Sequence, residues 1–221
     1  MSKTVSTLKI QTLGRFGISV DEKPVLTDWP DETIKELFCS LLSPLDLCIS
    51  WDRICQAMWG AAVTQTLRRR LDETLIGPLN RYLIKGLGFT PLITVHDGIG
   101  IDQKLINVDS FEFHRCAVDG LRLFSLGNYV AAREKFSRAQ SLYKGIYLPG
   151  VSGRIISKTR DNLESLHLTA VLDAMPLTRN SWSSEPGTKP ESDMYPKTER
   201  RPFHTVGFGL EESLYQGFRI I

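Results

Sequence analysis

The stretch that decides the fold is Ile93-Thr94-Val95-His96-Asp97-Gly98-Ile99-Gly100-Ile101, followed shortly by Val108-Asp109-Ser110-Phe111-Glu112. In the first segment, two apolar runs flank Asp97-Gly98, a residue pair that favours a two-residue hairpin turn. From Val108 onward, apolar residues recur at helical spacing. The sequence therefore predicts a terminal β-hairpin, after which the chain becomes wholly helical.

Upstream of this hairpin, the sequence predicts strands and then helices. Alternating apolar residues over positions 8–25 indicate a small antiparallel sheet. Two helices should follow, from about Thr33 to Leu42 and from Ser50, a favourable N-cap, to Gly60. A third helical stretch runs from about Val63 to Leu87. Gly77-Pro78 interrupts it, and since proline inside a helix costs about 3 kcal/mol, either a kink or two short helices would fit.

Downstream of the hairpin, apolar spacing predicts helices over Phe111 to Leu126 and Tyr129 to Tyr143, a pair that looks like one tetratricopeptide (TPR) unit. A further helix should span Ser157 to Met175. Residues 178–201 are rich in Ser, Pro, Glu, Thr and Lys, which is typical of disorder. Residues 206–221 are apolar again, and they either dock on the body or a partner or have no fold of their own.

The composition is that of a globular protein: 221 residues, 42% hydrophobic and 24% charged. No apolar run approaches the ~20 residues that span a bilayer, so we expect no membrane association. The N-terminus lacks the apolar core of a secretory signal, and a cytoplasmic location follows by default.

Metal and enzyme chemistry have little support in the sequence. Cys39, Cys48, Cys55 and Cys116 form no CxxC pair, and we expect reduced thiols, most of them buried, and no metal site. No GxSxG, P-loop or HExxH motif occurs, so we expect neither catalytic residues nor a cofactor. We also expect Trp29, Trp51 and Trp59 to pack in the core rather than form a stacking platform.

The N-terminal part of the chain is not basic, although a nucleic-acid-binding domain usually is. Residues 1–102 contain 11 Lys and Arg against 12 Asp and Glu, whereas residues 103–177 contain 10 against 7. DNA-binding domains are usually basic, because phosphate contacts dominate affinity. An N-terminal DNA-binding domain would therefore need a local positive patch.

The ordered segments resemble an OmpR-type winged helix-turn-helix joined to a shortened bacterial transcriptional activator domain, as in the antibiotic regulatory protein family of transcriptional regulators. The resemblance extends over about residues 8–175. It is carried by the opening strand Leu8 to Phe16, Lys35-Glu36-Leu37-Phe38 with Leu41-Leu42, Ser50, Ile54, Met58 and Trp59, the spine Ile76, Leu79 and Leu83, the hairpin Ile93 to Ile101, Val108 to Glu112, and Leu142-Tyr143-Lys144-Gly145 with Leu148-Pro149-Gly150.

Three departures from the family pattern lower the expected affinity for phosphate. Gly77-Pro78 stands where the family places basic residues in its recognition helix. Acidic residues (Asp28, Asp31 and Glu32) precede the first helix, where the family is usually basic. His96-Asp97 occupies the place of an arginine in the wing.

The resemblance implies an α+β protein with three parts: a winged helix-turn-helix DNA-binding domain (1–102), an all-α TPR-like activator domain (103–177) and a tail (178–221). Its expected function is transcription regulation, more often activation, through binding to double-stranded promoter DNA. The helical domain would mediate homodimerisation or contact RNA polymerase. The expected DNA-binding residues are Arg68, Arg69, Arg70, Thr74, Asn80, Arg81, Lys85, Thr94 and His96. The alternative is a protein–protein interaction module whose winged helix binds DNA weakly or not at all.

Overall fold

The computed structural model describes residues 8–43 and 48–180 and has a mixed α+β fold, as the sequence predicts. Its first sheet has the strand order β3-β2-β1-β7. The strands are β1 (Leu8–Gln11), β2 (Gly17–Val20), β3 (Lys23–Pro24) and β7 (Ile106–Val108). β1 to β3 are antiparallel, as expected, but β7 joins β1 in parallel, with Leu8 opposite Ile106. A strand of three residues is too short for alternation to reveal it.

The second sheet contains the hairpin on which the sequence argument rests. β5 (Leu92–Val95) and β6 (Gly98–Ile101) form it, and β4 (Cys48–Ser50) pairs with the other edge of β6. Val95 lies opposite Gly98, so the turn is His96-Asp97, and the expected Asp97-Gly98 turn is wrong by one residue. Gly98 is needed inside the strand, because a Cβ there would lie 2.2 Å from the carbonyl oxygen of Ile49.

The first two helices begin at side-chain caps. The Asp31 carboxylate accepts a hydrogen bond from the Thr33 amide at the start of α1 (Glu32–Ser40). Ser50 caps α2 (Trp51–Trp59), as predicted, through its hydroxyl and the Arg53 amide. Gly60 ends α2 with a left-handed backbone (φ 68°) that glycine adopts without strain.

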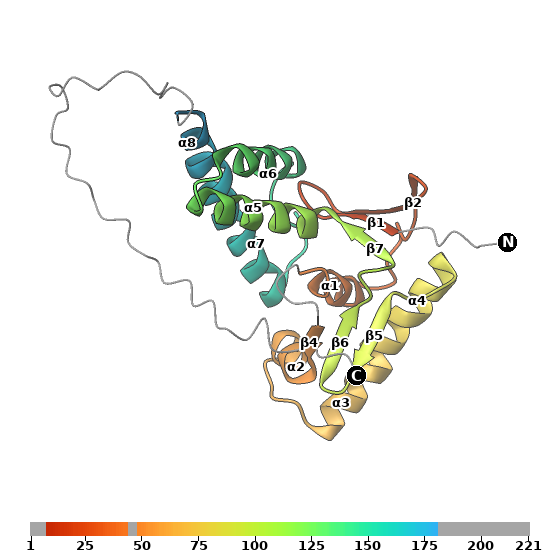
Figure 1. The fold of residues 1–221 in the computed structure, drawn as a ribbon. Coiled ribbons are helices and arrows are strands. Elements are labelled where there is room, and N and C mark those ends of the chain that lie inside the picture. The colour runs from red at the N-terminus through yellow and green to blue at the C-terminus, as the bar shows by residue number, and fades with distance from the viewer. Residues whose placement is uncertain (1–7, 44–47, 181–221) are drawn as a thin grey trace, which may run out of the picture. The chain divides into compact units, whose positions relative to one another are not determined.

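Gly77-Pro78 does not break the third helical stretch. α3 (Gln65–Leu71), a π-helical turn η1 (Asp72–Ile76) and α4 (Gly77–Leu87) follow one another as one long helix (Figure 1). The Gly77 amide donates to the Asp72 carbonyl five residues back, and Pro78, which has no N–H, comes directly after this wider turn. A Cβ at position 77 would lie 2.9 Å from the Asp72 oxygen, which explains the glycine.

Of the remaining helices, α5 (Asp109–Ser125) packs against the first sheet, and the others pack on α5 and on one another (Figure 1). These others are α6 (Tyr129–Leu142), α7 (Arg154–His167), the π-helical η2 (Leu168–Ala174) and α8 (Met175–Asn180). α5 and α6 approach closely because Gly120 lies against the ring of Phe136, where a Cβ would be 2.5 Å from the nearest ring atoms. As in the earlier helix, a π-helical segment ends two residues before a proline, here Pro176.

The predicted disorder from Thr178 is wrong for its first residues. α8 extends through Asn180, and Thr178 is buried, its hydroxyl donating to the Met175 carbonyl over 2.6 Å. α8 packs against α6 and η2, a tertiary contact that local composition does not report. The rest of the predicted tail, including the apolar segment 206–221, lies outside the described residues.

Asp109 joins the two halves of the described structure. Its carboxylate accepts hydrogen bonds from the Thr12 amide (2.7 Å), the Thr12 hydroxyl (2.6 Å) and the Leu13 amide (3.1 Å). Leu13 belongs to the hydrophobic cluster of the C-terminal helices, and Ile155 of α7 belongs to the N-terminal cluster. The end of β1 is thereby fixed to the start of α5.

Candidate nucleic-acid interface

The predicted DNA-binding residues lie on two elements, the helix formed by α3, η1 and α4 and the β5–β6 hairpin. The long helix buries Leu71, Leu75, Leu79 and Leu83, a row with a spacing of four that faces the N-terminal core. The opposite face of the helix is therefore the one that can meet a ligand.

Two of the three consecutive arginines are engaged by neighbouring side chains. Arg68 forms an ion pair with Asp72, and its guanidinium carbon lies 3.6 Å from the centroid of the Trp51 ring. With 27% of its side chain exposed, Arg68 braces the fold and is poorly placed to bind phosphate. Arg69 pairs with Glu73 over 2.7 Å, but both side chains are well exposed. Exposed pairs are worth about 0–1 kcal/mol, so a phosphate could displace Glu73.

The remaining basic residues of the helix are more accessible. Arg70 is exposed, with its guanidinium carbon 5.3 Å from the Trp59 ring centroid. Arg81 and Lys85 are exposed further along and have no ion-pair partner among the described residues. These three cations form the basic row of the helix.

The expected polar contacts are less favourable. The Thr74 hydroxyl donates to the Arg70 carbonyl of its own helix over 2.8 Å. Asn80 is half-buried beside the basic row. Thr94 and His96 are exposed on the hairpin, and the Nδ1 atom of His96 lies 2.6 Å from an Asp97 carboxylate oxygen. The hairpin strands and turn contain no Lys or Arg, so the hairpin adds little positive charge.

The three tryptophans within the described residues differ in what their rings contact. All three are half-buried and pack against the N-terminal core, as expected. Trp29 lies among aromatic rings, with centroids 5.3 Å from Phe38 and 5.0 Å from Tyr82. Trp51 and Trp59 also turn their faces to Arg68 and Arg70. Sequence reasoning missed these stacks, because they join side chains of different helices and leave no spacing signal.

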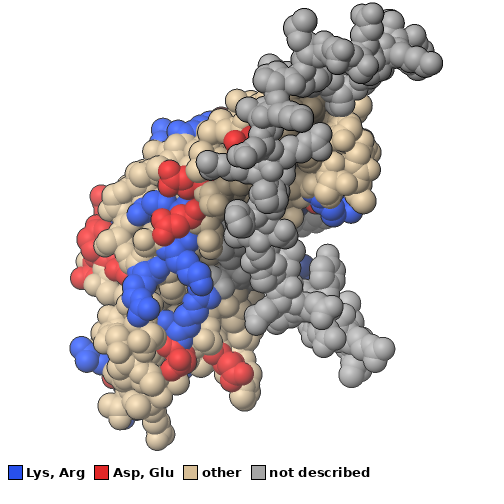
Figure 2. Space-filling model, turned by 90° about the vertical axis from the view of Figure 1, so that its left-hand side faces the viewer, with Lys and Arg blue, Asp and Glu red and all other residues tan. Residues whose placement is uncertain are grey.

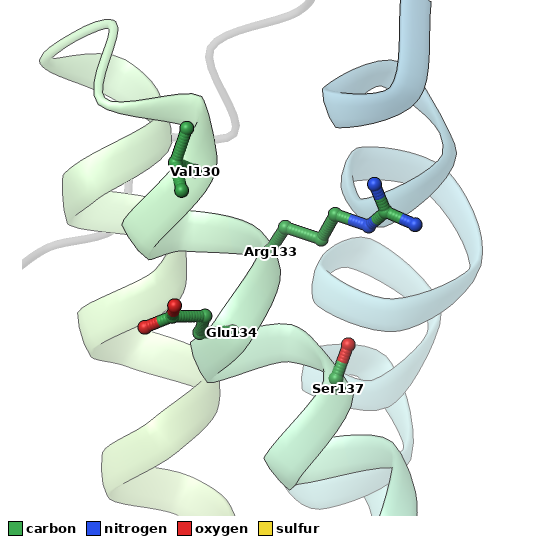
Figure 3. Close-up of a pocket in the computed structure, with 4 residues that line it drawn as sticks. All are labelled: Val130, Arg133, Glu134 and Ser137. Atoms are coloured by element: carbon green, nitrogen blue, oxygen red, sulfur yellow. The ribbon is translucent and has the colours of Figure 1, made fainter.

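Other surfaces lie on the side of the C-terminal helices. Figure 2 views the molecule from the left-hand side of Figure 1, and Lys and Arg gather in the middle of that face between patches of Asp and Glu. A hollow of about 430 Å³ lies on α6, lined by Val130, Arg133, Glu134 and Ser137. In Figure 3, Arg133 extends toward the helix at the C-terminal end of the described chain, and Glu134 points the other way.

A larger groove, of about 1130 Å³, runs between the first sheet and the α6–α7 connection. Its lining includes charged side chains of both signs, among them Lys9, Arg15, Glu112 and Lys144, and two aromatic rings, Phe16 and Trp29. None of the expected DNA-binding residues lines this groove or the hollow on α6.

Within residues 8–43 and 48–180, no group of three or more His, Cys, Asp or Glu side chains is arranged to hold a metal ion. No helix in the same ranges is both long and apolar enough to cross a membrane.

Comparison with known proteins gives a match in structure but none in sequence. No protein-family model matches the sequence, and no curated protein matches it. The structure of Mycobacterium tuberculosis EmbR in complex with a low-affinity phosphopeptide is similar, with a TM-score of 0.53 and 15% sequence identity over 80% of this chain. The alignment covers 44% of the EmbR chain, so this chain spans less than half of EmbR's length. At this identity the likeness concerns the fold, and the chain shares the mixed α+β fold of EmbR.

Proposed function

We propose that this chain is a DNA-binding transcriptional regulator of the antibiotic regulatory protein type. Residues 1–102 would form the winged helix-turn-helix, with α2 and the helix α3–η1–α4 as the motif and the β5–β6 hairpin as the wing. Residues 103–177 would form the helical activator domain that binds a partner protein. Double-stranded DNA is the proposed ligand of the first domain.

The observation that carries this proposal is the uninterrupted helix from Gln65 to Leu87. A break at Gly77-Pro78 would have separated Arg70 from Arg81 and Lys85, whereas the π-helical turn keeps all three on one element with an exposed face. A helix with a basic exposed face beside a β-hairpin is the arrangement that enters a major groove. The fold shared with EmbR, a transcriptional regulator, supports the same function.

Two observations favour the alternative, an interaction module with a weak or absent affinity for DNA. Asp72 and Glu73 offset the charge of Arg68 and Arg69 within the proposed reading helix itself. The Lys and Arg cluster of Figure 2 lies on the side of the C-terminal helices instead. Under this alternative, an acidic protein surface would bind that cluster.

Binding of the full chain to random-sequence duplex DNA across a salt series separates the two functions. For B-DNA, log K falls with log salt concentration with a slope of about −0.9 per phosphate neutralised. If Arg70, Arg81 and Lys85 each bind one phosphate, replacing all three by Gln should reduce the slope by roughly 2.7. Absence of salt-dependent binding by the parent near physiological ionic strength would refute DNA binding.

The matched control for this variant is Arg68→Gln. Arg68 lies on the same helix but is held by Trp51 and Asp72, so its loss should leave the salt slope unchanged. Equal slopes for the parent and the triple variant would exclude the basic row as the phosphate-binding surface. Circular dichroism at the binding temperature checks that each variant is folded.

A further inference from the structure

The turn of the β5–β6 hairpin is attached to the first residue of α2. The Trp51 amide donates a hydrogen bond to the Asp97 carbonyl over 2.8 Å, and the indole Nε1–H of Trp51 points to the His96 carbonyl, 3.4 Å away. Strand pairing of β4 with β6 extends to Ser50 opposite Gly98, the residue that directly follows the turn. Trp51 continues this attachment into the turn itself: its amide bond to Asp97 belongs to the backbone, whereas its indole contact with His96 depends on the side chain.

The same tryptophan also contacts the helix that follows α2. The Arg68 guanidinium covers the Trp51 ring at 3.6 Å and forms an ion pair with Asp72, one turn further along the helix. A guanidinium stacked on an indole is attracted by the ring face, and partial burial strengthens that attraction. The half-buried Trp51 side chain, which belongs to α2, thus contacts both the hairpin turn and α3.

We infer that Trp51 is a positioning residue for the proposed DNA interface, fixing the hairpin turn relative to the helix α3–η1–α4. Arg68 is the second half of this device and does not bind DNA. The inference rests on the proposed function, because the two elements it aligns are the proposed wing and reading helix. Its physical basis is preorganisation: elements already in their bound arrangement lose less conformational freedom on binding.

The geometric test measures a distance without DNA. Spin labels at His96→Cys on the turn and Thr66→Cys on α3 report the hairpin–helix separation, in full-length protein carrying Cys48→Ser to remove the exposed native thiol. Trp51→Leu should broaden the distance distribution, and Trp51→Phe, which keeps a ring for Arg68, should broaden it less. Trp59→Leu is the matched control, since Trp59 lies at the other end of α2 and faces Arg70.

The functional readout is DNA affinity without the labels. Trp51→Leu should weaken binding by roughly two- to tenfold, the scale expected for losing the order of one or two groups at an interface. The salt slope should stay at the parent value, because no phosphate contact is removed. A folding defect alone would lower the active fraction without broadening the distances in the folded protein.

Each outcome decides the inference. A narrow, parent-like distribution in folded Trp51→Leu protein overturns it, as does broadening of equal size in Trp59→Leu. If Trp51→Leu does not fold, Arg68→Gln takes its place: broadening supports the positioning role, and an unchanged width overturns it. If the parent protein binds no DNA, the proposed function is refuted. The distance measurement uses no DNA, so it tests the positioning role of Trp51 separately.

Discussion

Asp109 offers the sharpest test of how the two halves of the described structure are joined. Its carboxylate accepts hydrogen bonds from the amide and hydroxyl of Thr12, the amide of Leu13 and the amide of Ser110. Thr12 and Leu13 are fully buried, at 0% exposure. Asp109→Ala would leave these donors without the acceptor around which they are arranged.

The size of the effect follows from the number of buried donors. An unsatisfied buried donor costs about 1–3 kcal/mol, and water entering beside the half-buried residue 109 would recover part of this, so we expect Asp109→Ala to destabilise the protein by roughly 3–5 kcal/mol. Thr12→Val removes the hydroxyl donor alone and should cost about 1 kcal/mol.

Urea unfolding followed by circular dichroism measures both values, provided that the slope of unfolding free energy against urea stays at the parent value. Asp119→Ala is the control, because its partly exposed ion pair with Lys135, at 3.3 Å, should contribute no more than about 1 kcal/mol. If Asp109→Ala and Asp119→Ala destabilise the protein equally, the carboxylate of Asp109 does not hold β1 to α5, and the reasoning fails.

Three further predictions concern the rest of the molecule. Gly98→Ala should lower the unfolding free energy by at least about 2 kcal/mol, because the new Cβ would meet a β4 carbonyl oxygen at 2.2 Å. Gly17→Ala, with open space at its Cβ, should cost much less, and urea midpoints compare the two variants. A thiol reagent should label exposed Cys48 first. Burial raises the pKa of the Cys39 thiol to about 12, so Cys39 should react only on unfolding. Mass spectrometry of the digested protein identifies the order of labelling. Burial lowers the pKa of His114, so below about pH 6.5 the unfolded state binds more protons than the folded state, and the free energy of unfolding should fall as the pH is lowered. The urea midpoint of His114→Gln should therefore depend less steeply on pH than that of the parent. An unchanged pH dependence contradicts this role of His114.

Local signals in the sequence were sufficient for most helices and for the hairpin. Ser50 and Gly60 begin and end α2 as predicted, because N-caps and left-handed glycines act on the backbone of their own turn. The four-residue spacing of Leu71, Leu75, Leu79 and Leu83 gave the helix its buried face. The basic row was partly predictable as well, since exposed Arg81 and Lys85 lie opposite that face.

What the sequence by itself determined about this protein is therefore the identity and order of most of its elements, with corrections at the hairpin turn, at the short strand β7 and at α8. The tertiary structure decided how those elements are used. Contacts between distant segments pair β7 with β1, require Gly98 inside a strand, and place Trp51 over Arg68. Periodicity and capping report only neighbours along the chain, whereas these contacts depend on which surfaces meet after folding. That is why the sequence predicts Arg68 as a DNA contact and does not reveal that its guanidinium stacks on Trp51 and pairs with Asp72.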